Sequence, residues 1–148
     1  MTKQRLRTKA QVIVEVLIGI FVVSGLIDIN GLSRLLSHER AVLPTWLYWL
    51  QGTAGLLWLA ASVGLALTKE WGRKYGIAAI ILSSAHVFAL GCDTTRQILT
   101  VPPFESGPSP MVMLWPVLLP AVIRLITNIG SLWCLTRPSV RARFQQRT

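Results

Sequence analysis

Residues 45–67 of the chain read TWLYWLQGTAGLLWLAASVGLAL and contain no Asp, Glu, Lys or Arg. At the helical rise of about 1.5 Å per residue, this stretch is long enough to cross about 30 Å of hydrocarbon. Aromatic residues cluster at its start, at positions 46, 48 and 49, as they do at the level of lipid headgroups. The stretch therefore predicts a transmembrane helix.

Three more apolar stretches of comparable length accompany it, at about residues 10–29, 75–91 and 111–135. Together the four predict an all-α fold, with one integral membrane domain over residues 1–148 and four transmembrane helices in an up-down-up-down bundle. The third helix is expected to extend toward Leu99 as a wetter end, before a loop rich in Pro and Gly. No small-residue cleavage site closes the first stretch, so we expect a retained helix rather than a signal peptide.

The dipeptide Asn30-Gly31 is predicted to end the first helix, because Gly readily takes the positive φ found after many helices. Residues 32–43 are amphipathic and are expected to lie along the membrane interface. Pro44 is expected in the first turn of the next helix, where its missing N–H would have no partner in any case.

The composition points to lipid rather than to nucleic acid. Hydrophobic residues make up 52% and charged residues 14% of the 148 positions, whereas about a quarter of an average soluble domain is charged. The net charge of +9 comes from Lys and Arg residues that lie almost entirely in the tails and loops. We therefore expect contacts with the anionic lipid headgroups of the bilayer and no binding of nucleic acid.

The distribution of Lys and Arg between the two sides predicts the orientation. Residues 1–9 contain four of them, residues 68–75 contain three, and the basic C-terminal tail at 136–148 contains four. The opposite loops contain three, and Arg124 alone lies within a span. Since cytoplasmic loops carry an excess of Lys and Arg, both termini are predicted to be cytoplasmic.

The sequence contains no pattern typical of catalysis or metal binding. Cys92 and Cys134 are expected at opposite ends of their helices, too far apart for a disulfide, and no CxxC motif is present. His38 and His86 are expected at different depths, without spaced partner ligands. We therefore expect no catalytic residue, no metal ion and no cofactor, and the sequence favours a protein that is not an enzyme.

Polar residues share one face of each predicted helix. In the fourth helix, four polar residues from Arg124 to Ser131 are spaced i, i+3, i+4 and i+7. In the first helix, Glu15 lies within the apolar stretch. A charged group in hydrocarbon costs at least about 2.5 kcal/mol, so these faces should point into the bundle. We predict a linked polar network of Glu15, His86, Arg124 and Asn128.

Two interpretations of this network are open. Buried polar residues often hold membrane helices together at about 0.6 kcal/mol each, and this structural role is the favoured one. Intramembrane ionisable residues are also candidates for a ligand site or a proton path. Pro116 and Pro120, in the outer half of the fourth helix, are expected to kink or widen it. That change would serve either as a packing bend or as the entrance to a cavity.

Two stretches at the membrane boundary carry a resemblance. Residues 69–74 read KEWGRK, and residues 135–144 read LTRPSVRARF and follow the pattern L-x-R-P-x-V-R-x-x-F. On these residues the chain resembles a group of small four-helix bacterial inner-membrane proteins, most of them uncharacterised. The resemblance implies a four-helix fold in a bacterial plasma (inner) membrane, and it implies no active-site residues.

Two functional hypotheses follow. The first is a non-catalytic integral membrane protein that acts through a membrane-protein partner, as an accessory subunit or an immunity-like protector. Little soluble mass and short loops favour an interaction through the helices themselves. The alternative is a small transporter or channel that works as a homo-oligomer around the network of Glu15, His86, Arg124 and Asn128.

Overall fold

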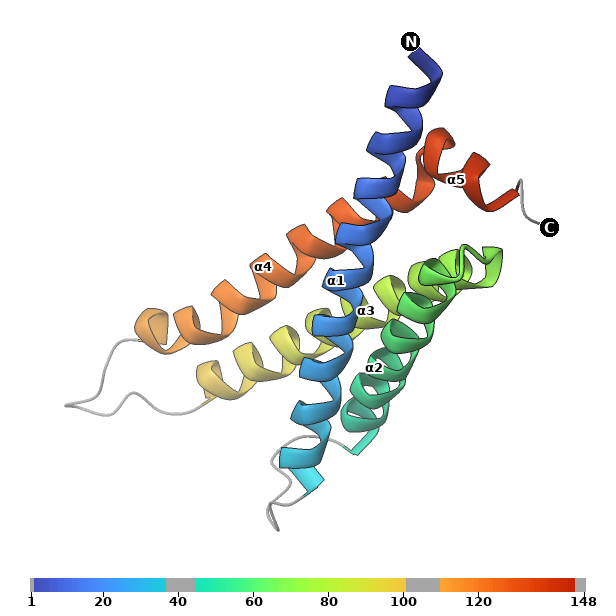
Figure 1. Ribbon diagram of the computed structural model, residues 1–148. Helices are drawn as coiled ribbons and strands as arrows, with labels where there is room; N and C mark the ends of the chain where they lie inside the picture. The colour runs from blue at the N-terminus through green and yellow to red at the C-terminus, as the bar shows by residue number, and fades with distance from the viewer. Residues whose placement is uncertain (1, 37–44, 101–109, 146–148) are drawn as a thin grey trace.

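The computed structural model describes residues 2–36, 45–100 and 110–145 as helices joined by short turns. The described helices are α1 (Thr2–Leu36), α2 (Thr45–Ala66), α3 (Glu70–Thr100), α4 (Pro110–Thr136) and α5 (Pro138–Gln145). Figure 1 shows the first four as long rods and α5 as a short helix that turns back beside α1.

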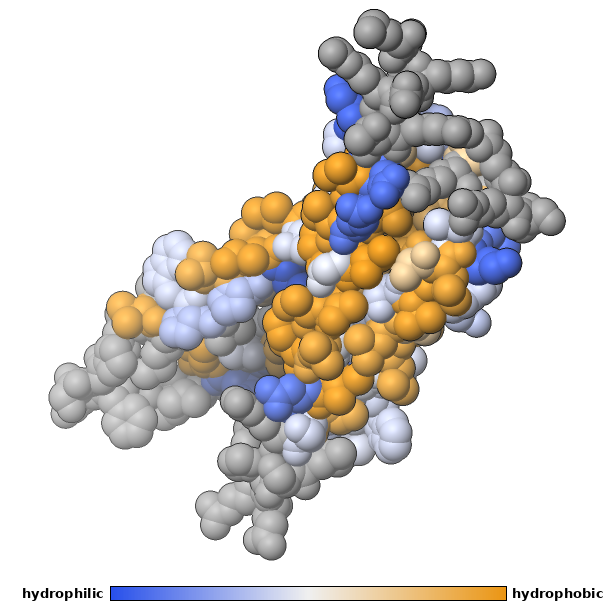
Figure 2. Space-filling model, in the orientation of Figure 1, coloured by the Kyte–Doolittle hydropathy of each residue, from blue (hydrophilic) through white to orange (hydrophobic). Residues whose placement is uncertain are grey.

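Four of the described helices are long and apolar enough to cross a membrane: Lys9–Ser33, Thr45–Ala66, Glu70–Ile98 and Leu114–Thr136. Apolar side chains cover much of the face shown in Figure 2. Large hydrophobic residues such as Leu56, Phe88 and Ile126 are more than 60% exposed, at 65%, 73% and 65%. In a bilayer such side chains contact lipid tails, so the surface supports a multi-pass membrane protein. The described elements are all helices, which confirms the predicted all-α class.

The predicted end of the first helix at Asn30-Gly31 is wrong. The helix α1 continues to Leu36, and no described Gly has a positive φ. Gly31 lies within the helix, and its open side is occupied by the side-chain amide of Gln51 from α2. Residues 32–36 thus belong to α1. The rest of the predicted interfacial segment, 37–43, and the predicted helix start at Pro44 lie outside the described residues.

The other boundaries differ less from the predicted ones. The helix α3 begins at Glu70, ahead of the predicted start at residue 75, and runs to Thr100, which agrees with the expected extension toward Leu99. Between α2 and α3, Thr68 has a φ of 54°, and the Lys69 amide donates to the Gly64 carbonyl at 2.8 Å. This left-handed residue closes the end of α2 and reverses the chain within a few residues.

The helix α2 lies between α1 and α3, while α4 packs mainly on α3 (Figure 1). At the centre, the rings of Phe21 and Trp58 meet edge to face with centroids 4.4 Å apart. Both side chains are almost fully buried, so they anchor the contact of α1 with α2.

The segment predicted as a basic C-terminal tail forms the helix α5. Pro138 occupies its first position, where the missing N–H is tolerated. Val140 and Phe144, one turn apart, are fully buried in the core. The Arg137 guanidinium lies 3.5 Å from the ring centroid of Trp133. The tail is therefore an amphipathic helix that covers one end of the bundle with its apolar face.

The helices α2 and α3 approach closely at Gly64 and Gly72. A Cβ atom built on Gly64 would lie 2.8 Å from the backbone nitrogen of Gly72, and one built on Gly72 would collide with the backbone of α2. Backbone atoms cannot move aside as a flexible side chain does, so both positions require Gly.

We predict that Gly64→Ala lowers the free energy of unfolding by about 2 kcal/mol, because the added methyl group overpacks this crossing. Gly19→Ala is the matched control, since nothing lies within 4 Å of a Cβ there. Thermal unfolding of both variants in mild detergent measures the difference. An equal melting temperature for the two variants would contradict the described crossing.

Candidate functional site

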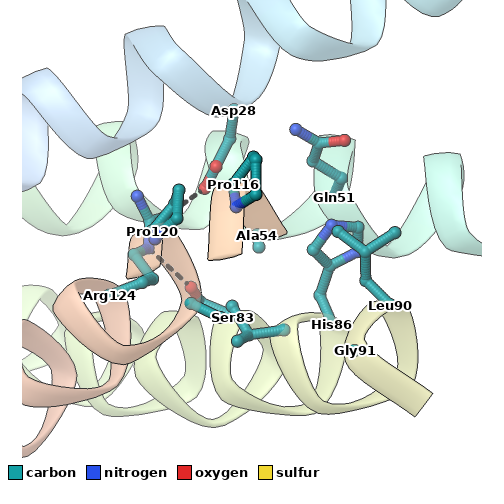
Figure 3. A pocket seen from close by; sticks show the side chains of 12 residues that line it. Asp28, Gln51, Ala54, Ser83, His86, Leu90, Gly91, Pro116, Pro120 and Arg124 are labelled. Carbon is teal, nitrogen blue, oxygen red and sulfur yellow. Dashed lines mark hydrogen bonds and ion pairs between the residues drawn. The ribbon is translucent and has the colours of Figure 1, made fainter. Parts of the chain in front are cut away.

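An ion pair between helices lies at the centre of the candidate site. Nη2 of Arg124, on α4, donates to Oδ2 of Asp28, on α1, at 2.6 Å. Nε of Arg124 donates to Oγ of Ser83, on α3, at 3.0 Å. Figure 3 shows both interactions as dashed lines. One guanidinium group thus joins α1, α3 and α4 through residues that are far apart in the sequence.

The same guanidinium also contacts α2. Its Cζ atom lies 5.7 Å from the ring centroid of Trp58, within the range of a cation–π interaction. The side chains of Arg124 and Asp28 keep 18% and 12% of their surface exposed. Most of the surface of both groups is covered by protein, and the carboxylate supplies the counter-charge for the arginine within the span.

A second polar contact lies one helical turn from the ion pair. Nδ2 of Asn128 donates to Oγ of Ser84 at 2.9 Å and so links α4 to α3 again. Asn128 is 2% exposed, and its Oδ1 atom has no hydrogen-bond partner among the described residues. This contact fits the structural role expected of buried amides between membrane helices.

Glu15 does not join this group. Its side chain is exposed on α1, where its Oε1 accepts a hydrogen bond from Nε2 of Gln11 at 2.9 Å. The expectation that Glu15 faces the bundle interior is therefore wrong. Asp28 is the carboxylate that Arg124 reaches.

A signal for Asp28 was present in the sequence. Six of the seven buried positions described on α1 are spaced alternately four and three residues apart, and they are Ala10, Val14, Leu17, Phe21, Ser24 and Asp28; the seventh, Gly25, lies beside Ser24. This spacing is that of a helix face packed against neighbouring helices. Glu15 falls outside the series and Asp28 within it. The predicted helix end at residue 30 obscured the pattern, because it placed Asp28 at the membrane boundary.

The ion pair borders a cavity of about 410 Å³ between the four long helices. Twelve residues line it: Asp28, Gln51, Ala54, Ser83, His86, Val87, Leu90, Gly91, Pro116, Pro120, Ala121 and Arg124. The helix α4 stays helical through both of its internal prolines. Since both prolines border the cavity, they take part in its wall, as the cavity interpretation of their pattern expected.

His86 lines the cavity, away from the ion pair. Figure 3 shows its ring below Gln51, with Asp28 and Arg124 on the other side of the view. The Nδ1 atom of His86 is buried without a hydrogen-bond partner among the described residues. The structure thus brings Arg124 and His86 to one cavity, places Asn128 one turn from Arg124, and leaves Glu15 outside.

The cavity presents several kinds of polar group. The polar side chains of the cavity are a carboxylate, a guanidinium, an amide, an imidazole and a hydroxyl group, and the remaining wall is mostly apolar. Within the described ranges, no cluster of three or more His, Cys, Asp or Glu side chains could hold a metal ion, and Cys92 and Cys134 are both free thiols. No protein-family model, no curated protein and no solved structure matches the chain.

Proposed function

We propose that the chain is a multi-pass protein of a bacterial plasma membrane, with its four spans in up-down-up-down order and both termini in the cytoplasm. The excess of Lys and Arg in residues 1–9, 68–75 and 136–148 supports this orientation. The packing of α5 beside α1 supports it as well, since it brings the two ends of the chain to one side (Figure 1). Basic side chains there contact anionic headgroups.

Within this topology, the function that the geometry supports best is a non-catalytic one: a small transporter or channel that binds a ligand in the polar cavity. The carrying observation is that Arg124 and Asp28 keep part of their surface exposed to a cavity of about 410 Å³ inside the spans. A pair that is fully enclosed by protein can interact only with its own neighbours. A pair that borders a cavity is available to the contents of that cavity.

The cavity belongs to the outer half of the bilayer in this orientation. Asp28 lies toward the outer end of α1, and Leu90, Gly91 and Pro116 lie toward the outer ends of their helices. The inner half of the bundle is closed by the apolar core around Leu135 and Phe144, both fully buried. A ligand would therefore enter from the outside and meet the ion pair at the bottom of the cavity.

We predict that a cysteine at Leu90 or Ala121 reacts with a membrane-impermeant thiol reagent added outside intact cells. Both positions line the cavity. The background is the chain with Cys92→Ser and Cys134→Ser, which removes the native thiols. The control is Phe88→Cys, two residues from Leu90 and 73% exposed on the lipid-facing surface of α3.

Labelling is expected to be at least about tenfold faster at Leu90→Cys and Ala121→Cys than at Phe88→Cys, because thiolates form and react in water and not in lipid tails. The additional substitution Gly91→Leu places a larger side chain at the cavity wall, where a Cβ has open space. It should slow the labelling of the two cavity cysteines and leave the labelling rate of Phe88→Cys unchanged. Rates at both cavity sites as slow as that of the control would show a cavity closed to water and would contradict the proposal.

A second candidate function, interaction with a membrane-protein partner, is favoured by the position of Glu15. Its carboxylate lies on an exposed strip of α1 within the span Lys9–Ser33, beside Val12 and Val16, which are 52% and 56% exposed. One turn further on, Gly19 has open space around it. A small residue beside a polar one is a common combination where two membrane helices pack together.

We predict that a photoreactive amino acid at position 19 cross-links to a neighbouring protein in cell membranes, and that Glu15→Leu reduces the yield at least about fivefold by removing the polar contact. The matched control is the same photoreactive residue at Leu56, which is 65% exposed on α2. Equal yields at positions 19 and 56, or no effect of Glu15→Leu, would exclude this partner surface.

A further inference from the structure

The wall of the cavity carries one charge of each sign at the same place. The guanidinium of Arg124 and the carboxylate of Asp28 are in contact, and both line the cavity. Figure 3 places this pair on one side of the view and the uncharged Gln51 amide on the other. The two charges cancel, so the charged part of the cavity is neutral overall. The positive and the negative group are in direct contact with each other.

Both charged groups retain capacity for further hydrogen bonds. A guanidinium has five N–H donors, and the structure uses Nε for Ser83 and Nη2 for Asp28. No bond to Nη1 of Arg124 or to Oδ1 of Asp28 is found among the described residues. Arg124 can thus donate to an added oxyanion while Asp28 accepts from an added ammonium group.

The balance of charge selects between classes of ligand. An anion alone would meet the Asp28 carboxylate, and a cation alone would meet the Arg124 guanidinium. Either ion would also leave one uncompensated charge in a region of low dielectric constant, which costs several kcal/mol. A ligand that carries both charges adds no net charge and satisfies both groups.

The size and the remaining wall of the cavity fit a small ligand of this kind. A volume of about 410 Å³ is near the lower end of the range of about 300–1,000 Å³ seen for ligand pockets. Leu90, Ala121 and Pro116 are apolar residues of the cavity wall, and such residues can cover the carbon atoms of the ligand.

We infer that the cavity binds a small zwitterion, a molecule with an oxyanion and a primary ammonium group a few bonds apart. The oxyanion binds Arg124 and the ammonium group binds Asp28. A free α-amino acid and the headgroup of phosphatidylethanolamine share this chemistry. The inference rests on the proposed role of the cavity as a ligand site and names the class of ligand.

The test measures the melting temperature of the purified, delipidated full-length protein in detergent as each probe is added, since a ligand that binds the folded state raises it. The soluble probes are L-serine and L-leucine, and the lipid probe is short-chain phosphatidylethanolamine. The matched single-charge probes are the N-acetyl amino acids, the amino acid amides and short-chain phosphatidylglycerol.

We expect at least one zwitterion to raise the melting temperature, with a dissociation constant at least about tenfold lower than those of its single-charge analogues. Gly91→Leu, which adds a larger side chain to the wall of the cavity, should abolish the shift. Gly19→Leu, at an exposed position with nothing within 4 Å of its Cβ, should retain it. A shift with amino acids alone identifies a soluble ligand, and a shift with phosphatidylethanolamine alone identifies a lipid headgroup.

Other outcomes overturn the inference. In one of them, a single-charge probe binds more tightly than the zwitterions, and Gly91→Leu abolishes that binding. In that case the cavity is a ligand site, and only the inference that its ligand is a zwitterion is wrong. If no probe shifts the melting temperature, the zwitterion inference fails, and the thiol labelling of Leu90→Cys and Ala121→Cys then decides separately whether the proposed function fails with it.

Discussion

The ion pair between Arg124 and Asp28 is the interaction on which the rest of the structure depends. Hydrocarbon offers no water to a charge, so an arginine within a span needs a counter-charge from the protein itself. The counter-charge comes from α1, although α4 packs mainly on α3 and meets α1 at few points. The pair therefore fixes the position of α4 relative to the first helix and holds the cavity between them.

Much of the fold was predictable, because the constraint of the bilayer is simple. Four apolar stretches of sufficient length predict four helices, and the structure has them at nearly the expected positions. The end of α1 was not predictable from Asn30-Gly31, because a Gly that ends a helix and a Gly that admits a neighbouring helix look alike in sequence. The structure places Gly31 inside α1, which continues to Leu36, with the side chain of Gln51 beside it.

The candidate site was predicted in part. The polar face of α4 identified Arg124 and Asn128, and the structure gives both of them partners on α3. The acidic partner was assigned to Glu15 because that residue lies deeper in the apolar stretch of α1. The depth of a residue along a helix says less about its partners than the side of the helix on which the residue lies. The alternating spacing of buried residues on α1 includes Asp28 and excludes Glu15. The cavity itself could not be predicted, since it arises from four helices at once.

The central claim is that Asp28, and not Glu15, neutralises Arg124, and the stability of four variants in detergent tests it most directly. Asp28→Asn leaves the arginine charge without its partner and is expected to lower the free energy of unfolding by about 3 kcal/mol. Glu15→Gln should change it by less than about 0.5 kcal/mol, because that side chain is exposed. Arg124→Met should be destabilising alone, and in the double variant with Asp28→Asn it should restore most of the lost stability. Additive losses for Asp28→Asn and Arg124→Met, or equal losses for Asp28→Asn and Glu15→Gln, would contradict the account.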